Sequence, residues 1–107
     1  MRGCGKLNCI GQCLIVAGTL AITPAFGADP SNGERLARRW CSSCHVVASN
    51  QRGPTSEAMP FATMAKRPDF DAAKIAFFLL NPHPKMPNMG LSRTEAADLA
   101  AYIATLK

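Results

Sequence analysis

The stretch Cys41-Ser42-Ser43-Cys44-His45 carries the most specific signal in this sequence. Two cysteines separated by two residues and followed at once by histidine form the C-x-x-C-H pattern, which is typical of c-type haem attachment. This spacing places the two thiols one helical turn apart, so both can reach vinyl groups on one edge of a porphyrin. We therefore predict that Cys41 and Cys44 bind one haem through thioethers and that His45 is the proximal iron ligand.

A C-x-x-C pair is also found in thioredoxin-like redox sites and in zinc sites. A zinc site needs two further ligands, and His83 is the only other histidine, with no second cysteine pair outside the N-terminal segment. A thioredoxin-like pair lies between a strand and a helix of a βαβ unit, and the sequence has no such pattern. Both readings are therefore weaker than haem attachment.

The first 27 residues have the features of a cleavable secretory signal peptide. Arg2 and Lys6 precede an apolar run over residues 14–22, and Ala25 and Gly27 are the small residues that a signal peptidase reads. An uncleaved anchor is the alternative, but the apolar run is short for a membrane span. We expect cleavage at or near Gly27, which leaves residues 28–107 as one domain.

Cleavage also changes the cysteine count and the charge. Cys4, Cys9 and Cys13 leave with the signal, so of five cysteines only the motif pair remains. The 80 residues from 28 to 107 keep ten of the twelve basic residues and all seven acidic ones, a formal charge of +3. This balance does not favour nucleic-acid binding. Export places the domain in an oxidising compartment, the periplasm in bacteria, where haem is attached.

The remaining sequence predicts an all-α domain of three to five helices. The first begins at Asp29, with Pro30 at its first position, or at a Ser31–Glu34 capping box, and it leads into the motif. A short helix is expected before Lys66, and a third, largely buried helix follows a cap at Asp69 or Asp71. The last helix begins at the capping box Ser92–Glu95. Gly33 falls inside the first helix, where a close packing contact would explain it.

The residue opposite His45 decides what the haem does, because an open position binds small ligands whereas a thioether excludes them. Residues 81–90 contain three prolines and form a stiff loop that offers Met86 and Met89. Pro84 and Pro87 restrain the backbone around Met86, which we prefer to Met89. His83 in the same loop is an alternative ligand that would give a bis-histidine haem. Met59 and Met64 are expected in the core.

These residues together resemble the class I monohaem cytochromes c of the small bacterial type. The resemblance spans the mature chain: Gly33, the haem motif, Gly53-Pro54, Met86-Pro87 and the final helix with Leu99, Tyr102 and Ile103. It implies helices wrapped around one covalent haem, with the terminal helices crossing at Gly33 and Tyr102.

The resemblance also implies that the Pro54 carbonyl accepts a hydrogen bond from His45, and it favours Met86 as the distal ligand. Many members of the family bind a haem propionate with a mid-chain Trp or Tyr. Trp40 and Tyr102 are the only such residues in this chain, so Arg52, Lys66 or Arg67 is expected to take that role.

We expect a periplasmic one-electron carrier, a monomer and not an enzyme, that serves an exported dehydrogenase, oxidase or respiratory complex. Lys74 and Lys85 are expected to steer an acidic partner, and no stable membrane insertion of the mature protein is expected. One alternative is a haem subunit fixed in a larger respiratory or dehydrogenase complex. Others are a ligand-binding or peroxidatic haem protein and a helical thiol protein without haem.

Overall fold

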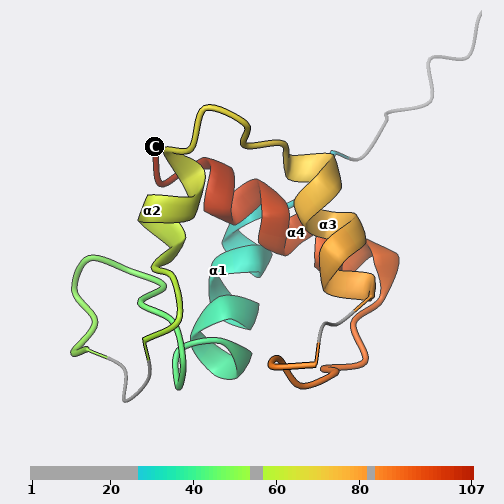
Figure 1. Cartoon of the computed structure of the whole chain (residues 1–107). Coiled ribbons are helices and arrows are strands. Elements are labelled where there is room, and N and C mark those ends of the chain that lie inside the picture. The colour runs from blue at the N-terminus through green and yellow to red at the C-terminus, as the bar shows by residue number, and fades with distance from the viewer. Residues whose placement is uncertain (1–26, 54–56, 82–83) are drawn as a thin grey trace, which may run out of the picture.

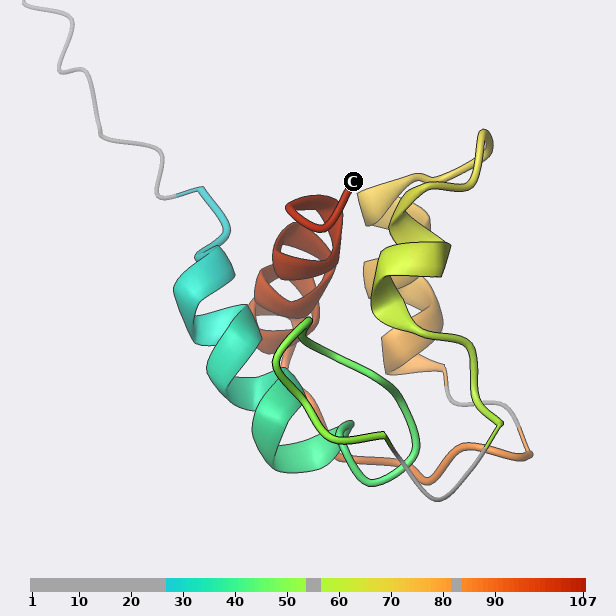
Figure 2. The ribbon, with the colours of Figure 1, turned by 90° about the vertical axis from the view of Figure 1, so that its left-hand side faces the viewer.

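A computed structural model describes residues 27–53, 57–81 and 84–107. This part of the chain folds into four helices and has no strand: α1 (Pro30–Trp40), α2 (Phe61–Ala65), α3 (Ala72–Leu80) and α4 (Arg93–Ala104). Helix α4 lies at the centre and packs against each of the other three (Figures 1 and 2). The predicted all-α class is confirmed. The predicted signal peptide lies outside the described residues, apart from Gly27.

Helix α1 begins where the sequence predicts. The Asp29 side chain accepts hydrogen bonds from the amides of Ser31 and Asn32 at 2.9 and 3.2 Å, and Pro30 occupies the first turn. Asp29 is therefore the cap, and the alternative box of Ser31 with Glu34 is not used. The helix ends at Trp40, so Cys41 becomes its C-terminal cap and the haem motif starts directly at the helix end.

Helices α1 and α4 cross in close contact at Gly33. A Cβ atom at this position would overlap the carbonyl oxygen of Asp98 and would lie 2.8 Å from the Cβ of Tyr102. The backbones can approach this closely only because glycine has no side chain. The predicted close contact at Gly33 and the crossing at Tyr102 are both confirmed.

A buried carboxylate strengthens the same crossing. Asp98 is only 4% exposed, and it accepts hydrogen bonds from the Asp29 amide and from the Asn32 side-chain amide, both at 2.7 Å. Both carboxylate oxygens are thereby satisfied, as a buried charge requires. Asp98 thus ties the start of α1 to the middle of α4.

Helix α4 begins with the predicted capping box. The Glu95 amide donates to the Ser92 hydroxyl at 3.1 Å, and the Ser92 amide donates to the Glu95 carboxylate at 2.8 Å. Its inner face supplies the largest share of a core that also draws on α1, α2 and the segment after the haem motif. The buried members are Leu36, Ala37, Cys41, Val47, Phe61, Ala65, Leu99, Tyr102 and Ile103.

Helix α3 differs from the expectation of a buried helix. Asp71 caps it, accepting from the amides of Ala73 and Lys74 at 2.8 and 3.2 Å, but none of its residues is fully buried. Phe77 is 70% exposed and Phe78 44%. The apolar pattern of α3 predicted burial in the packed core. One face of the helix instead borders a cavity. None of the helices in the described part of the chain combines the length and apolar character needed to cross a bilayer.

Candidate functional site

A large cavity lies between the haem motif, helices α2 and α3, and the loop before α4. Its volume is about 750 Å³, within the range of about 300–1,000 Å³ that is usual for ligand and cofactor sites. Most of its wall is apolar and comes from Trp40, Phe61, Phe70, Ile75, Phe78, Leu79, Leu99 and Ile103. An apolar wall of this size suits a large flat cofactor.

The haem motif forms one end of this cavity. Cys41, Cys44 and His45 all line it. The amides of Cys44 and His45 donate to the Cys41 carbonyl at 3.2 and 2.9 Å, which winds the motif into a single turn. The two thiols and the imidazole consequently face the same space, as the five-residue spacing predicts.

The two cysteines have different surroundings. Cys41 is 6% exposed, whereas Cys44 is exposed. Burial, together with the neighbouring Cys44, raises the pKa of the Cys41 thiol to about 11, because a thiolate is poorly solvated there. Cys41 is therefore a neutral thiol at neutral pH.

The ring of His45 is oriented by two contacts. Its Nδ1 atom lies 2.6 Å from the carbonyl oxygen of Met59, and its ring centroid lies 5.3 Å from that of Phe61. A protonated Nδ1 donating to this carbonyl leaves Nε2 with a free lone pair, the arrangement that metal-binding histidines commonly have. The Pro54 carbonyl, which the family resemblance implied as the acceptor, lies outside the described residues. In the described part, Met59 provides this oxygen.

The chain directly after His45 is held by three carbonyl contacts. The carbonyl of His45 accepts from the Gln51 side chain at 2.9 Å, that of Val46 accepts from the Phe61 amide at 3.0 Å, and that of Val47 accepts from the Tyr102 hydroxyl at 2.6 Å. Burial raises the pKa of Tyr102 above its ordinary value, so its hydroxyl stays a donor at neutral pH. Gln51 falls in a polar loop with no spacing pattern, so its role is not predictable from the sequence alone.

Four methionines border the cavity. Met86 and Met89, the two predicted candidates for the distal ligand, both line it and are both half-buried. Met59 and Met64, expected in the core, line it as well, and Met59 is 40% exposed. The structure thus brings both loop methionines to the site. His83 lies outside the described residues.

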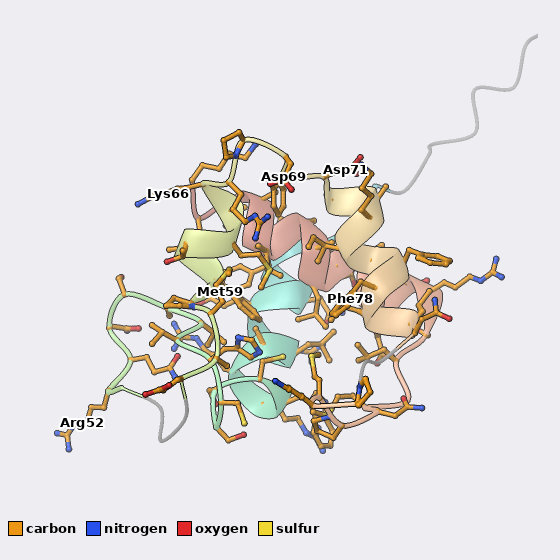
Figure 3. The ribbon with its side chains drawn as sticks, in the orientation of Figure 1. Arg52, Met59, Lys66, Asp69, Asp71 and Phe78 are labelled. Atoms are coloured by element: carbon orange, nitrogen blue, oxygen red, sulfur yellow. The ribbon has the colours of Figure 1, made fainter. Side chains whose placement is uncertain are left out.

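Charged side chains gather at another part of the cavity wall. Arg67 donates to the Asp69 carboxylate through Nε and an Nη atom at 3.0 and 3.2 Å, and Asp71 and Lys74 line the cavity beside this pair. The hydrogen bonds from Arg67 lower the pKa of Asp69. Asp69 and Asp71 lie close together where α3 begins (Figure 3).

Of the three basic residues proposed for the propionates, only Arg67 lines the cavity. Arg52 and Lys66 extend away from the body of the molecule (Figure 3). Lys74 and Lys85, which we expect to steer an acidic partner, both line the cavity.

These residues fit a covalently bound haem. Two thiols, an oriented imidazole and thioether groups all line the cavity. Basic side chains and an apolar wall complete its lining. A zinc site fits less well, because no group of three or more His, Cys, Asp or Glu side chains in the described residues is placed to hold a metal ion.

Comparison with known proteins agrees with this geometry. The family model described as cytochrome c oxidase, cbb3-type, subunit III matches residues 28–103. A cytochrome c-552 of Bradyrhizobium diazoefficiens is 52% identical over 101 residues, which cover 94% of this chain and 97% of that relative. The chain belongs to the monohaem c-type cytochromes. No solved structure matched this cytochrome.

Membership of this family confirms two expectations from the sequence. The cofactor of the cytochrome is covalently bound haem c, and its function is that of an electron carrier that works with redox partners. The readings as a thioredoxin-like protein, a zinc protein or a haem-free thiol protein are thereby set aside.

Proposed function

We propose that this cytochrome is an exported one-electron carrier whose haem is bound by Cys41 and Cys44 and ligated by His45 and Met86. The observation that carries the proposal is that all four side chains line one cavity. Haem c, when bound, supplies one-electron chemistry at an iron that alternates between Fe(III) and Fe(II). The chain contributes the thioether bonds, the two axial ligands and the exclusion of water.

His45 is suited to be the proximal ligand because its ring is already oriented. The contact between Nδ1 and the Met59 carbonyl, at 2.6 Å, directs the other nitrogen away from that carbonyl. The Phe61 ring lies tilted by 48° against the imidazole and restricts its rotation. A ligand held in one orientation changes its geometry little between redox states, which favours fast electron transfer.

Met86 is our proposed distal ligand. Pro87 restricts the backbone of Met86 to extended conformations, which reduces the entropy lost on binding iron. Met89 is also restrained, since the Asn88 side chain accepts from the Gly90 amide at 2.9 Å. Rigidity alone therefore does not separate the two residues, and the preference rests on the Met-Pro pair of the resembling family.

The optical spectrum of the oxidised protein tests this ligand set. A Met–Fe(III) bond gives a weak charge-transfer band in the red. We expect Met86→Ala to lose this band and Met89→Ala to keep it, with both proteins still carrying haem by the pyridine haemochrome assay. The reverse pattern would assign Met89, and a wild-type protein without the band would refute methionine ligation.

Basic residues of the cavity are proposed to bind the haem propionates and to guide partners. Arg67 uses only two of its five N–H donors on Asp69, so it retains donors for a propionate. Lys74 and Lys85 line the same cavity and are exposed, and we propose that they attract an acidic partner surface. Raising the ionic strength should then slow electron transfer to the partner, and Lys74→Gln should weaken this dependence.

We propose a periplasmic location and removal of residues 1–27. The basis is the signal-peptide pattern of the sequence together with haem attachment outside the cytoplasm. The intact mass of haem-loaded protein from a periplasmic fraction tests both points. A mass that corresponds to a chain starting at or near Ala28 plus one haem is expected, and a haem-loaded chain that retains residue 1 would contradict cleavage.

The main alternative is a haem subunit fixed in a larger complex. The matching family model is named after an oxidase subunit, which favours testing this reading directly. A free monomeric carrier elutes alone at the mass of one chain from the native host, whereas a fixed subunit elutes with its complex. Carbon monoxide binding to the reduced protein at neutral pH would instead indicate a ligand-binding or peroxidatic role, which we do not expect.

A further inference from the structure

The side chain of Gln51 makes three hydrogen bonds to the backbone of the haem motif and its exit. Its Nε2 donates to the carbonyl of Ser42 at 3.0 Å and to that of His45 at 2.9 Å. Its Oε1 accepts from the amide of Val47 at 2.7 Å. A flipped amide would place its oxygen against two carbonyls, so these partners determine its orientation.

These three bonds add side-chain contacts to a turn that the backbone already closes, and they link this turn to the segment after it. Ser42 belongs to the turn that carries the cysteines and is anchored to α1, since its amide donates to the Ala37 carbonyl at 3.1 Å. His45 closes this turn, since its amide donates to the Cys41 carbonyl at 2.9 Å, and Val47 lies beyond it. The Gln51 side chain thus contacts the start of the turn at Ser42, its end at His45 and the segment beyond it at Val47.

Gln51 is itself held in place. Its amide donates to the Ala48 carbonyl at 3.2 Å, which closes a tight turn after Val47, and its side chain is half-buried. The two residues after His45 are held by the core. The Val46 carbonyl accepts from Phe61 and the Val47 carbonyl accepts from Tyr102. Gln51 provides the corresponding contact one residue earlier, because its side chain donates to the His45 carbonyl.

We propose that Gln51 is a positioning residue that fixes the backbone of His45, so that the imidazole keeps its orientation toward iron in both redox states. This inference rests on the proposed ligation by His45. The proposed role affects the rate of electron transfer. Movement of an iron ligand between redox states adds to the reorganisation energy, which slows this transfer. Removing partners that orient a metal ligand typically changes affinity or activity by 10- to 100-fold.

Two substitutions of Gln51 distinguish the hydrogen bonds that its side-chain amide donates from the one that it accepts. Gln51→Met has nearly the same shape and removes all three bonds. Gln51→Glu keeps an acceptor for the Val47 amide but places carboxylate oxygen against the carbonyls of Ser42 and His45. The matched control is Asn50→Leu, because Asn50 is adjacent and exposed, and its side-chain oxygen accepts a long hydrogen bond of 3.4 Å from Arg38.

The measurements use the haem-loaded protein. We expect Gln51→Met to shift the paramagnetically displaced NMR signals of the His45 ring and to lower the electron self-exchange rate about tenfold. We expect Gln51→Glu to have the larger effect and Asn50→Leu to match the wild type. If both Gln51 variants lose stability but keep wild-type His45 signals and rate, Gln51 only stabilises the loop and the proposal is wrong.

A measurement on the wild type keeps the proposal testable if the variants do not accumulate. The side-chain amide protons of Gln51 should exchange slowly with solvent in both Fe(III) and Fe(II) protein, whereas exchange at the rate of a free amide would refute the proposal. Failure of the proposed ligation is distinguishable, since it would appear as wild-type protein lacking the signals of an iron-bound histidine.

Discussion

The hydroxyl of Tyr102 in α4 donates a hydrogen bond of 2.6 Å to the carbonyl of Val47, two residues after His45. Both residues are buried, and 55 residues of sequence separate them. The last helix thereby holds the segment that leaves the haem motif, and this contact joins the structural core to the cofactor site.

Tyr102→Phe removes this bond with little change in shape. The Val47 carbonyl then stays buried without its partner, which should lower the free energy of unfolding by about 1–3 kcal/mol. Guanidinium denaturation of the haem-loaded protein measures the effect. Asn81→Ala is the control, because it removes an exposed side-chain bond to the Phe77 carbonyl and should cost less than about 0.5 kcal/mol. Equal losses in the two variants would contradict the importance of the buried contact.

Gly33→Ala should be strongly destabilising. Alanine favours helix, but its Cβ would overlap the backbone of Asp98, so the helices α1 and α4 must move apart. We expect a loss of about 3 kcal/mol or more, at the upper end for overpacking. Gly53→Ala is the matched control, since a Cβ there meets nothing within 4 Å. A denaturation midpoint of Gly33→Ala that equals that of Gly53→Ala would show that the crossing is looser than described.

The two motif thiols should differ in reactivity in chain produced without haem. Cys44 is exposed, whereas Cys41 is buried with its pKa raised to about 11 from an ordinary 9.0. At pH 8 this shift leaves Cys41 with about 100-fold less thiolate than an unperturbed thiol. Iodoacetamide should therefore label Cys44 first, as read by peptide mass spectrometry.

The sign of the pH effect on Cys41 follows from the raised pKa. Labelling of Cys41 should rise steeply as the pH increases from about 9 toward 11. The stability that its neutral form contributes is complete below pH 9 and is lost as the pH rises through this interval. Urea should abolish the difference between the thiols, and equal rates in the absence of urea would contradict the burial of Cys41.

The pair of Arg67 and Asp69 gives a prediction at acid pH. Hydrogen bonds from Arg67 lower the pKa of Asp69 below its ordinary 3.8. The stabilisation by this pair is therefore present above about pH 4 and is lost as the pH falls through the lowered pKa. NMR titration of the Asp69 carboxyl should show a midpoint below 3.8 in the wild type and a higher one in Arg67→Gln. An unchanged midpoint in the variant would show that other groups set it.

Local signals in the sequence predicted much of this fold. The caps Asp29 and Asp71 and the box of Ser92 with Glu95 depend on neighbouring residues, and each was predicted, although Asp29 and Asp71 were each one of two alternatives. The meeting of Cys41, Cys44 and His45 at one cavity also follows from local spacing.

Contacts between distant residues were harder to predict. The partners of Asp98 and Gln51 depend on which segments the fold brings together, and a single polar side chain carries no periodic signal of this. The burial of α3 was overestimated for a related reason. Apolar residues such as Ile75 and Leu79 have the same pattern whether they meet other side chains or border a cavity that a cofactor fills.

The helix crossing at Gly33 has a consequence for how the chain tolerates change in length. The contact of Asn32 with Asp98 closes a loop of 66 residues that contains the haem motif and both loop methionines of the cavity. Because closure entropy grows only with the logarithm of loop length, inserting ten residues into a surface turn of this loop costs only about 0.1 kcal/mol. We therefore expect the chain to tolerate insertions between the two helices, whereas loss of Asn32 or Asp98 removes the closing contact itself.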